Sequence, residues 1–172
     1  MDLPPSAAII DVGGGTSRLV DELLTAGYED LTVLDLSREA LETSRSRLGD
    51  VSGQVSWLAE DITQTDLPAA RFDLWHDRAV FHFLTAASDR EAYVARLHRS
   101  LRPGGRVLMA TFAQTGPERC SGLPVMRYGP ASLHAALGAD LRLIRSATEH
   151  HTTPGGAVQD FNFCLFERPR LP

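Results

Sequence analysis

The sequence has little of what would mark a disulfide-bonded or metal-bound protein. Its only two cysteines, Cys120 and Cys164, stand far apart and outside any Cys-x-x-Cys pair, so neither a disulfide framework nor a zinc ribbon is predicted. The six histidines are scattered, and the adjacent pair His150 and His151 would point to opposite faces of a strand. We therefore expect reduced thiols and no metal site.

Basic charge and long apolar runs are also missing. The net charge of −5 gives no electrostatic reason to expect nucleic acid as a partner. No stretch reaches the length of a membrane-spanning helix, and the start "MDLPPSAAII" lacks the charged and apolar regions of a secretory signal. We expect a cytoplasmic protein that binds neither nucleic acid nor a membrane.

Length and composition predict one globular domain over residues 1–172, without repeats or linkers. Apolar runs of strand length alternate with helix-like segments. The strands are expected at 7–12, 31–36, 55–59, 72–76 and 106–112, and the helices at 16–28, 37–49 and 88–101. Such alternation requires right-handed crossovers and a mostly parallel sheet, which predicts a doubly wound, Rossmann-like α/β fold.

The expected helix ends follow from single residues. Gly27 is suited to the left-handed position that closes the first helix, and Ser37 is the expected N-cap of the second. Ser88 and Glu91 have capping-box spacing at the start of the third.

The C-terminal third breaks the alternation. Segments 140–151 and 157–168 look like two strands joined by "TTPGG", which is too short for a crossover helix, so an antiparallel hairpin is predicted there. The stretch 116–130, rich in proline and glycine, is predicted to be a long functional loop.

Three consecutive glycines, Gly13, Gly14 and Gly15, follow the first predicted strand. Ligands of open parallel sheets bind at the carboxyl ends of the strands, and residues without a Cβ let the backbone come close to a ligand. A tight turn without a ligand is the alternative, but three glycines exceed what a turn requires. We therefore interpret this turn as part of a binding site.

Acids follow the next two strands. Asp35, 20 residues after Gly15, is placed to accept hydrogen bonds from both ribose hydroxyls of an adenosine. Asp61 ends the following strand at the same edge, where it can accept a hydrogen bond from the adenine amino group. Either acid alone is more typical of a solvated loop or a helix cap, but acids at successive strand ends predict a nucleoside site.

Two residues argue against a dinucleotide. Arg18 stands where the Gly-x-Gly-x-x-Gly fingerprint requires its last glycine. Asp11 would repel a pyrophosphate, whereas its carboxylate suits a ligand with an ammonium group. An NAD-dependent oxidoreductase is therefore disfavoured.

The segments "IDVGGGTSRL", "LTVLDLS", "LAEDIT", "FDLWHDRAVFHFL" and "LRPGGRVLMATF" occur in an order and spacing that resemble the class I S-adenosylmethionine-dependent methyltransferases. The resemblance covers nearly the whole chain. It implies a seven-stranded, mostly parallel sheet of order 3-2-1-4-5-7-6 with a C-terminal antiparallel hairpin, and S-adenosylmethionine as the cofactor.

The resemblance also implies cofactor contacts. Gly13 and Gly15 would line the methionine portion, and Asp11 would help to orient its amino group through the loop or water. Asp35 would hold the ribose, and Asp61 would frame the adenine. The full set of cofactor residues is Asp11, Gly13, Gly14, Gly15, Asp35, Leu36, Asp61, Ile62 and His76.

The chain departs from the family at two places. Ser17 stands where the family often has a third motif glycine, and Ile9 is reached without the one or two helices that usually precede the first strand and close over the site. This predicts a more open site, weaker cofactor binding, or a cover supplied by a neighbouring subunit. A truncated sequence would look the same.

Methyl transfer is an in-line displacement that mainly requires alignment. The catalytic candidates are His76, Asp77 and Arg78, which lie where the family places acceptor-facing residues. His76 or Asp77 would take a proton from the acceptor or contact the methionine amino group, and Arg78 would grip an anionic acceptor. The alternatives are that His76 caps the strand through a backbone hydrogen bond, and that Arg78 pairs with Asp77 or another local acid.

Three loop residues, Cys120, Arg127 and Tyr128, are candidates for the acceptor pocket, although a buried, inert thiol is the alternative for Cys120. His82, flanked by phenylalanines, is expected to pack in the core. Trp57 and Trp75 are expected in the core or a pocket wall.

We expect a methyltransferase that acts on a small molecule. The alternatives are a protein (lysine) methyltransferase and a catalytically weak cofactor-binding module that lacks its lid. The sequence names neither the acceptor nor its nucleophilic atom, and it leaves a homo-oligomer open.

Overall fold

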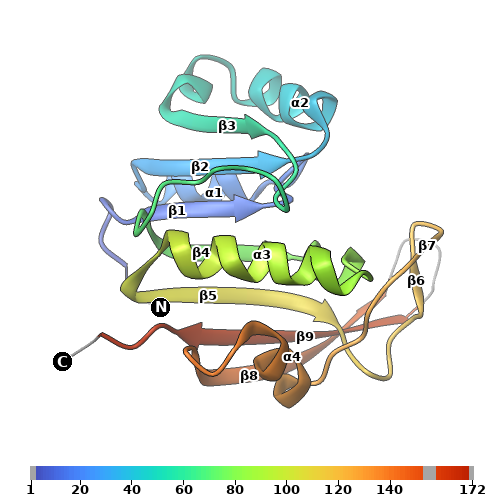
Figure 1. Cartoon of the computed structure of the whole chain (residues 1–172). Coiled ribbons are helices and arrows are strands. Elements are labelled where there is room, and N and C mark those ends of the chain that lie inside the picture. The colour runs from blue at the N-terminus through green and yellow to red at the C-terminus, as the bar shows by residue number, and fades with distance from the viewer. Residues whose placement is uncertain (1–2, 153–157, 171–172) are drawn as a thin grey trace.

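The computed structural model describes residues 3–152 and 158–170. Its centre is a seven-stranded sheet of order β3-β2-β1-β4-β5-β9-β8 (Figure 1). The strands are β1 (Ala8–Val12), β2 (Asp30–Asp35), β3 (Val55–Ala59), β4 (Phe72–Arg78), β5 (Leu101–Phe112), β8 (Arg142–Thr152) and β9 (Val158–Glu167). β1 to β5 are parallel, and β9 lies antiparallel between β5 and β8. Because β8 and β9 are the sixth and seventh strands of this sheet along the chain, the predicted strand order and C-terminal hairpin are confirmed.

Helices cover both faces of the sheet (Figure 1). The elements are α1 (Leu19–Thr25), α2 (Arg38–Leu48), α3 (Ala87–Ser100) and α4 (Pro130–Leu137), with short 3-10 turns at Gly49–Gln54 and Phe81–Phe83. No helix in the described ranges is long and apolar enough to cross a membrane.

The core forms two layers because the parallel strands are apolar on both sides. Ile9 and Val33 belong to the layer that includes Val20 of α1. Ile10 belongs to the layer that includes Tyr93 of α3. Alternation along β1 and β4 therefore decides which side chains face α1 and α2, and which face α3.

Two of the three predicted helix ends are confirmed. Gly27 has a φ of 85° directly after the cap of α1, and Ser37 accepts a hydrogen bond from the Ala40 amide at 3.1 Å. The predicted cap of α3 is wrong, because the helix begins at Ala87, one residue before Ser88.

Segment 116–130 is more ordered than the predicted loop. It contains a small hairpin of β6 (Arg119–Cys120) and β7 (Leu123–Pro124), joined by Ser121 and Gly122 with φ values of 50° and 80°. Positive φ at both turn positions matches the twist of a two-residue hairpin, so the Ser-Gly pair is the sequence signal for it. The "TTPGG" connection spans residues 152–156, and all of it after Thr152 lies outside the described residues.

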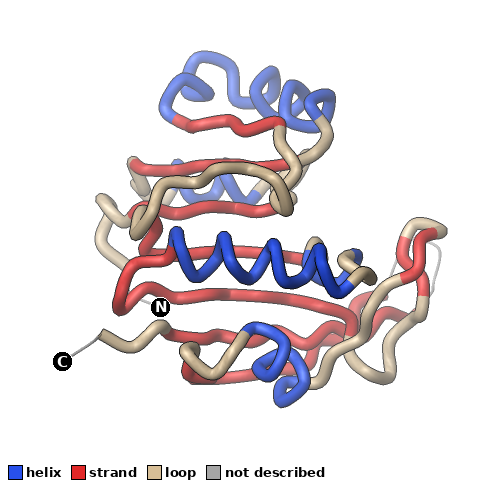
Figure 2. Tube along the Cα trace, viewed as in Figure 1, coloured by secondary structure: helices blue, strands red, loops and turns tan. Residues whose placement is uncertain are grey.

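Loops gather at the carboxyl edge of the parallel strands (Figure 2). β3 and β4 are joined by residues 60–71, which form an extended loop without a helix. The segments after β1, β2, β3 and β4 therefore meet at one edge, where the sequence predicts the site.

Candidate active site

Two neighbouring cavities lie at this edge. The first, here the β2–β3 cavity, has a volume of about 730 Å³ and is lined by residues that follow β1, β2, β3 and β4. The second, here the glycine-turn cavity, has a volume of about 670 Å³ and is lined by residues 13–17 and by side chains of β1, β4 and β9. Gly13 and Asp35 line both, so the two cavities adjoin at these residues.

The glycine turn has no room for side chains. Gly13 has a φ of 74°, and a Cβ there would clash with the side chain of Val80. A Cβ on Gly14 would lie 2.7 Å from Asp11 Oδ2, and one on Gly15 would lie 2.8 Å from Asp35 Oδ2. Because these glycines have no side chains, the carboxylates of Asp11 and Asp35 can lie directly against the backbone of the turn, beside the cavity.

Asp11 and His76 form a buried pair on neighbouring strands. They are partners in the β1–β4 register, and His76 Nδ1 lies 2.7 Å from Asp11 Oδ1. Asp11 is 4% exposed, and its Oδ2 has no hydrogen-bond partner within the described part of the chain. His76 is therefore bonded to a carboxylate. The alternative prediction, that it caps the strand through a backbone hydrogen bond, is wrong.

Asp77 points to the opposite face of the sheet. Its Oδ1 accepts a hydrogen bond from the Val80 amide, and its Oδ2 accepts bonds from the Phe81 amide and the Tyr93 hydroxyl. Complete burial raises its pKa to about 6, against the lowering effect of the Tyr93 bond. The structure does not bring Asp77 to either cavity, because adjacent residues of a strand alternate between faces. The expectation that it faces the acceptor is therefore corrected.

Arg78 returns to the face of His76 and lines the glycine-turn cavity. It forms no ion pair or hydrogen bond with any residue that the structure describes, so the alternative of a pair with Asp77 is wrong. Phe163 of β9 lines the same cavity. The register Arg78–Ala110–Phe163 places it there, and no signal in the sequence defines that antiparallel register.

Asp35 lies between the cavities. Its Oδ1 accepts a hydrogen bond from the Ser37 amide at 2.8 Å, which also fixes the start of α2. The neighbouring Leu36 is 76% exposed although it is apolar, and it lines the β2–β3 cavity. An exposed leucine at the mouth of a cavity is a surface for a flat, apolar ligand group.

Asp61 also lines the β2–β3 cavity, beside Ile62. Its Oδ1 accepts hydrogen bonds from the amide and hydroxyl of Thr63, and its Oδ2 accepts one from Gln64 Nε2. Burial alone would raise the pKa of Asp61, but these bonds outweigh it and the pKa is lowered. Both oxygens therefore hold the turn after β3, which limits what Asp61 offers to a ligand.

The β6–β7 hairpin contributes residues that sequence reasoning missed. Leu123, 58% exposed, and Pro124 line the β2–β3 cavity together with Leu36. The hairpin is held by bonds from the Val125 amide to the Glu118 carbonyl and from the Met126 amide to the His82 carbonyl.

The three predicted loop residues do not line either cavity. Arg127 is tied to Glu118 and to the Gly116 carbonyl. Tyr128 is 5% exposed with its ring 5.5 Å from that of Phe81, and Cys120 is half-buried on β6. Their assignment to the acceptor pocket stays a prediction.

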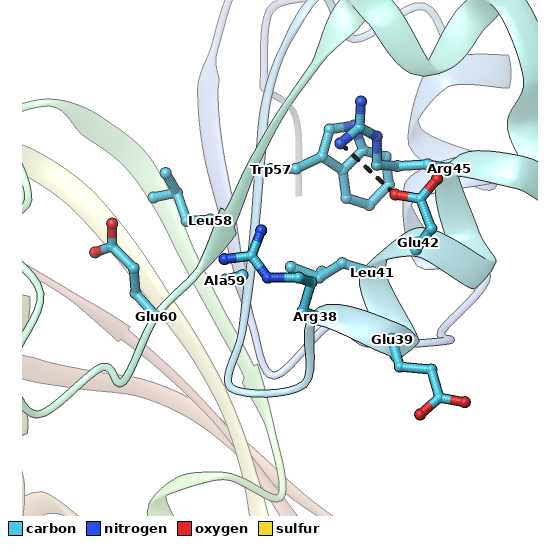
Figure 3. A pocket seen from close by; sticks show the side chains of 9 residues that line it. All are labelled: Arg38, Glu39, Leu41, Glu42, Arg45, Trp57, Leu58, Ala59 and Glu60. Atoms are coloured by element: carbon cyan, nitrogen blue, oxygen red, sulfur yellow. Dashed lines mark ion pairs between the residues drawn. The ribbon is translucent and has the colours of Figure 1, made fainter.

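A third cavity, of about 700 Å³, lies between α2 and β3 at the edge of the sheet (Figure 3). Its charged side chains include Arg45 and Glu42, which form an ion pair at 3.8 Å. Trp57 forms a wall, as predicted, and donates its indole N–H to the Ser52 carbonyl. None of the unpartnered buried polar atoms in the described part of the chain lies in this cavity, so it shows no feature that calls for a ligand.

His82 and Trp75 are core residues, as the sequence predicts. His82 is fully buried against the rings of Phe83 and Phe112, and burial lowers its pKa to about 4. Among the described residues, no three His, Cys, Asp or Glu side chains are grouped so that they could hold a metal ion.

The strand order, the bare turn after β1 and the acids after β2 and β3 together define a Rossmann-like domain of the class I methyltransferase type. Residues 9–105, more than half of the chain, match the family model described as a methyltransferase domain. The chain therefore belongs to the methyltransferase-domain family. This confirms the resemblance to class I S-adenosylmethionine-dependent methyltransferases, with S-adenosylmethionine as their cofactor.

Named relatives are distant. The chain is 25% identical over 185 aligned positions to the eEF1A lysine and N-terminal methyltransferase of Mus musculus; the match covers 96% of this chain and 26% of that protein. The chain thus spans about a quarter of this relative.

Solved structures show the same fold. A methyltransferase from Methanosarcina mazei aligns with a TM-score of 0.80 at 14% identity, over 98% of this chain and 95% of the other. The 1,6-didemethyltoxoflavin-N1-methyltransferase of Burkholderia thailandensis, with S-adenosylhomocysteine bound, aligns with a TM-score of 0.74 at 22% identity, over 95% of this chain and 72% of the other.

Proposed function

We propose that this protein transfers a methyl group from S-adenosylmethionine to an acceptor at the carboxyl edge of its sheet. The observation that carries the proposal is the buried Asp11 carboxylate, whose Oδ2 has no partner within the described residues and lies against the bare backbone of Gly14. A buried carboxylate oxygen without a partner is costly unless a cation or donor reaches it. The ammonium group of the cofactor's methionine portion is such a cation.

The two cavities divide the cofactor between them in this proposal. The β2–β3 cavity would take the adenosine, with the free lone pairs of Asp35 on the ribose and with Leu36 and Ile62 against the adenine. The adjoining glycine-turn cavity would take the methionine portion. When bound, the cofactor supplies a methyl group on a positively charged sulfur.

His76 is proposed to hold the acceptor's proton. Its Nδ1 is engaged by Asp11 Oδ1, so the neutral ring would carry its proton on Nδ1 and leave Nε2 as the acceptor of a proton. The Asp11 bond also fixes the orientation of the ring, which positions this base beside the cavity. Asp77, held in the core, is proposed to support the fold only.

A small molecule is the proposed acceptor, in a cytoplasmic setting. The net charge of −5 gives no electrostatic reason to expect nucleic acid as the acceptor, and the toxoflavin enzyme, which is named for a small-molecule acceptor, shares the fold. A protein lysine acceptor is the second candidate, because the mouse relative is named for that activity and matches 96% of this chain. A binding module without turnover is the third.

Calorimetric titration with S-adenosylmethionine and S-adenosylhomocysteine tests the cofactor, and donor consumption with panels of metabolites and proteins tests the acceptor. The chain contains no lysine, so any methyl-lysine detected belongs to an added protein and not to the enzyme itself. Binding with turnover of a metabolite supports the proposal. Binding without turnover favours the module, and folded protein without affinity for either ligand contradicts the proposed function.

A further inference from the structure

One positive charge in the glycine-turn cavity has no partner among the described residues. Arg78 stands at the end of β4, two residues beyond His76 and on the same face of the sheet. Its guanidinium group forms no ion pair or hydrogen bond inside the described ranges 3–152 and 158–170. Ten other arginines donate hydrogen bonds to carboxylates or carbonyls. Arg78 is exposed, and among the arginines without such a bond in the described ranges it is the one that lines this cavity.

Two other basic side chains near the turn, Arg47 and His76, are already engaged. Arg47 reaches the turn, but its guanidinium is bound by Asp21 and by the carbonyls of Thr16 and Ser17. His76 is bound through Nδ1 to Asp11. Arg18 does not line the cavity. Arg78 is therefore the permanent cation that this cavity presents to a ligand.

The cavity thus offers one charge of each sign. Asp11 contributes a buried carboxylate oxygen without a partner, and Arg78 contributes a guanidinium without a partner. The β1–β4 register ends with the pair Val12 and Asp77, and the residues that follow them, Gly13 and Arg78, both line the cavity. A ligand that carries both an ammonium and a carboxylate on one carbon matches this arrangement, because a guanidinium binds a carboxylate with two hydrogen bonds.

We infer that Arg78 binds the carboxylate of the cofactor's amino-acid portion, while Asp11 binds its ammonium group. This inference rests on the proposed function. It replaces the expectation from the sequence that Arg78 grips an anionic acceptor, since Arg78 is then a cofactor residue. It also gives the site a way to recognise the whole zwitterion. A cofactor analogue that lacks the carboxylate would leave Arg78 without a partner.

Three ligands separate the possible functions of Arg78. S-Adenosylhomocysteine has both charged groups, its decarboxylated analogue has the ammonium alone, and 5′-methylthioadenosine has neither. Binding of each is measured by calorimetry to the wild type and to Arg78→Gln, with methylthioadenosine read by competition where direct heats are small. Arg106→Gln, on β5 and outside both cavities, is the matched control.

We expect Arg78→Gln to weaken S-adenosylhomocysteine about 10- to 100-fold, the range of a charged hydrogen-bonded pair, and to leave both truncated ligands within about twofold. The wild type should bind the decarboxylated analogue more weakly than S-adenosylhomocysteine by a similar factor. Arg78→Gln should bind these two ligands almost equally. Arg106→Gln should match the wild type throughout.

Two results would overturn the inference. If Arg78→Gln binds S-adenosylhomocysteine as the wild type does, Arg78 does not contact the carboxylate. If it weakens all three ligands equally, Arg78 supports the fold of the cavity. Wild-type protein that binds none of the three contradicts the proposed function itself, which is a different outcome from either.

Discussion

The hydroxyl of Tyr93 donates a 2.6 Å hydrogen bond to Asp77 Oδ2, in a part of the core where both side chains are fully buried. Trp75 Nε1 donates in turn to the Tyr93 oxygen. Asp77 also accepts the amides of Val80 and Phe81, and Val80 packs against the space beside Gly13. A buried carboxylate on the α3 face of the sheet therefore fixes the segment that supports the glycine turn.

Asp77 should make the protein more stable in mild acid. Burial raises its pKa from 3.8 to about 6, so the folded state keeps a proton that the unfolded chain releases. Its contribution to the free energy of unfolding is fully present below about pH 4. As the pH rises from about 4 to about 6, this contribution falls by about 3 kcal/mol. Asp77→Asn should remove this gain, as urea unfolding from pH 4 to 8 would show. The exposed Asp50→Asn should leave the profile unchanged.

His82 should act in the opposite direction. Burial lowers its pKa from 6.5 to about 4, so the unfolded chain binds a proton that the folded state does not. Stability should fall by about 3 kcal/mol as the pH drops from about 6.5 to about 4, which opposes the effect of Asp77. His82→Asn, which keeps an acceptor for the Phe112 amide, should remove this loss. If the free energy of unfolding of His82→Asn depends on pH in the same way as that of the wild type, measured in the same urea series, His82 is not the source of this loss.

Gly14 should be the most informative glycine to substitute. Its φ is ordinary, but a Cβ would lie 2.5 Å from Val33 Cγ1 and 2.7 Å from Asp11 Oδ2. Gly14→Ala should lower the free energy of unfolding by about 1–3 kcal/mol and weaken S-adenosylhomocysteine at least tenfold, because it displaces the Asp11 carboxylate. Gly53→Ala, with nothing within 4 Å, should change neither quantity by more than about 1 kcal/mol.

Asp35 should bind the nucleoside and not the amino-acid portion. Asp35→Asn keeps an oxygen for the Ser37 amide, so the start of α2 should survive. We expect it to weaken S-adenosylhomocysteine and 5′-methylthioadenosine by the same factor, about 10- to 100-fold. The contrast with Arg78→Gln, measured with the same two ligands, is the test. Glu39→Gln on α2 is the control and should bind both as the wild type does.

Leu123 should contribute apolar area to the cofactor cavity. It is 58% exposed, and covering that surface with a ligand is worth about 1 kcal/mol, so Leu123→Ala should weaken S-adenosylhomocysteine about fivefold. Ile144→Ala, an exposed apolar residue on β8 outside the cavity, should have no effect. Equal affinities of the two variants in calorimetry would show that the hairpin does not cover the ligand.

The sequence predicts the fold well over the first 112 residues, because there the spacing of apolar residues and the residues that end helices and strands indicate the same elements. The strand ends fall where the acids and glycines stand, so residues such as Asp35 and Asp61 could be assigned to one edge before the structure was known. The α4 helix and the β6–β7 hairpin were missed, because short elements within a long connection have weak periodicity.

The candidate site was predictable only where it depends on strand ends. His76 and Asp77 were predicted to act together because they are adjacent in the sequence. Adjacent residues of a strand point to opposite faces, however, and Asp77 lies in the core. Phe163 could not be found, because its place depends on the register of an antiparallel pair that no local pattern specifies. The Asp11–His76 bond likewise needs the pairing of two strands that are 65 residues apart in the chain.

The insertion of β9 between β5 and β8 has a consequence for how such a protein can be altered. Every side chain assigned here to the cofactor except Leu123 comes from residues 11–78, whereas Phe163 reaches the same cavity from a strand near the other end of the chain. Replacing the C-terminal hairpin would therefore change one wall of the glycine-turn cavity at Phe163, while the lining side chains from residues 11–78 stay the same.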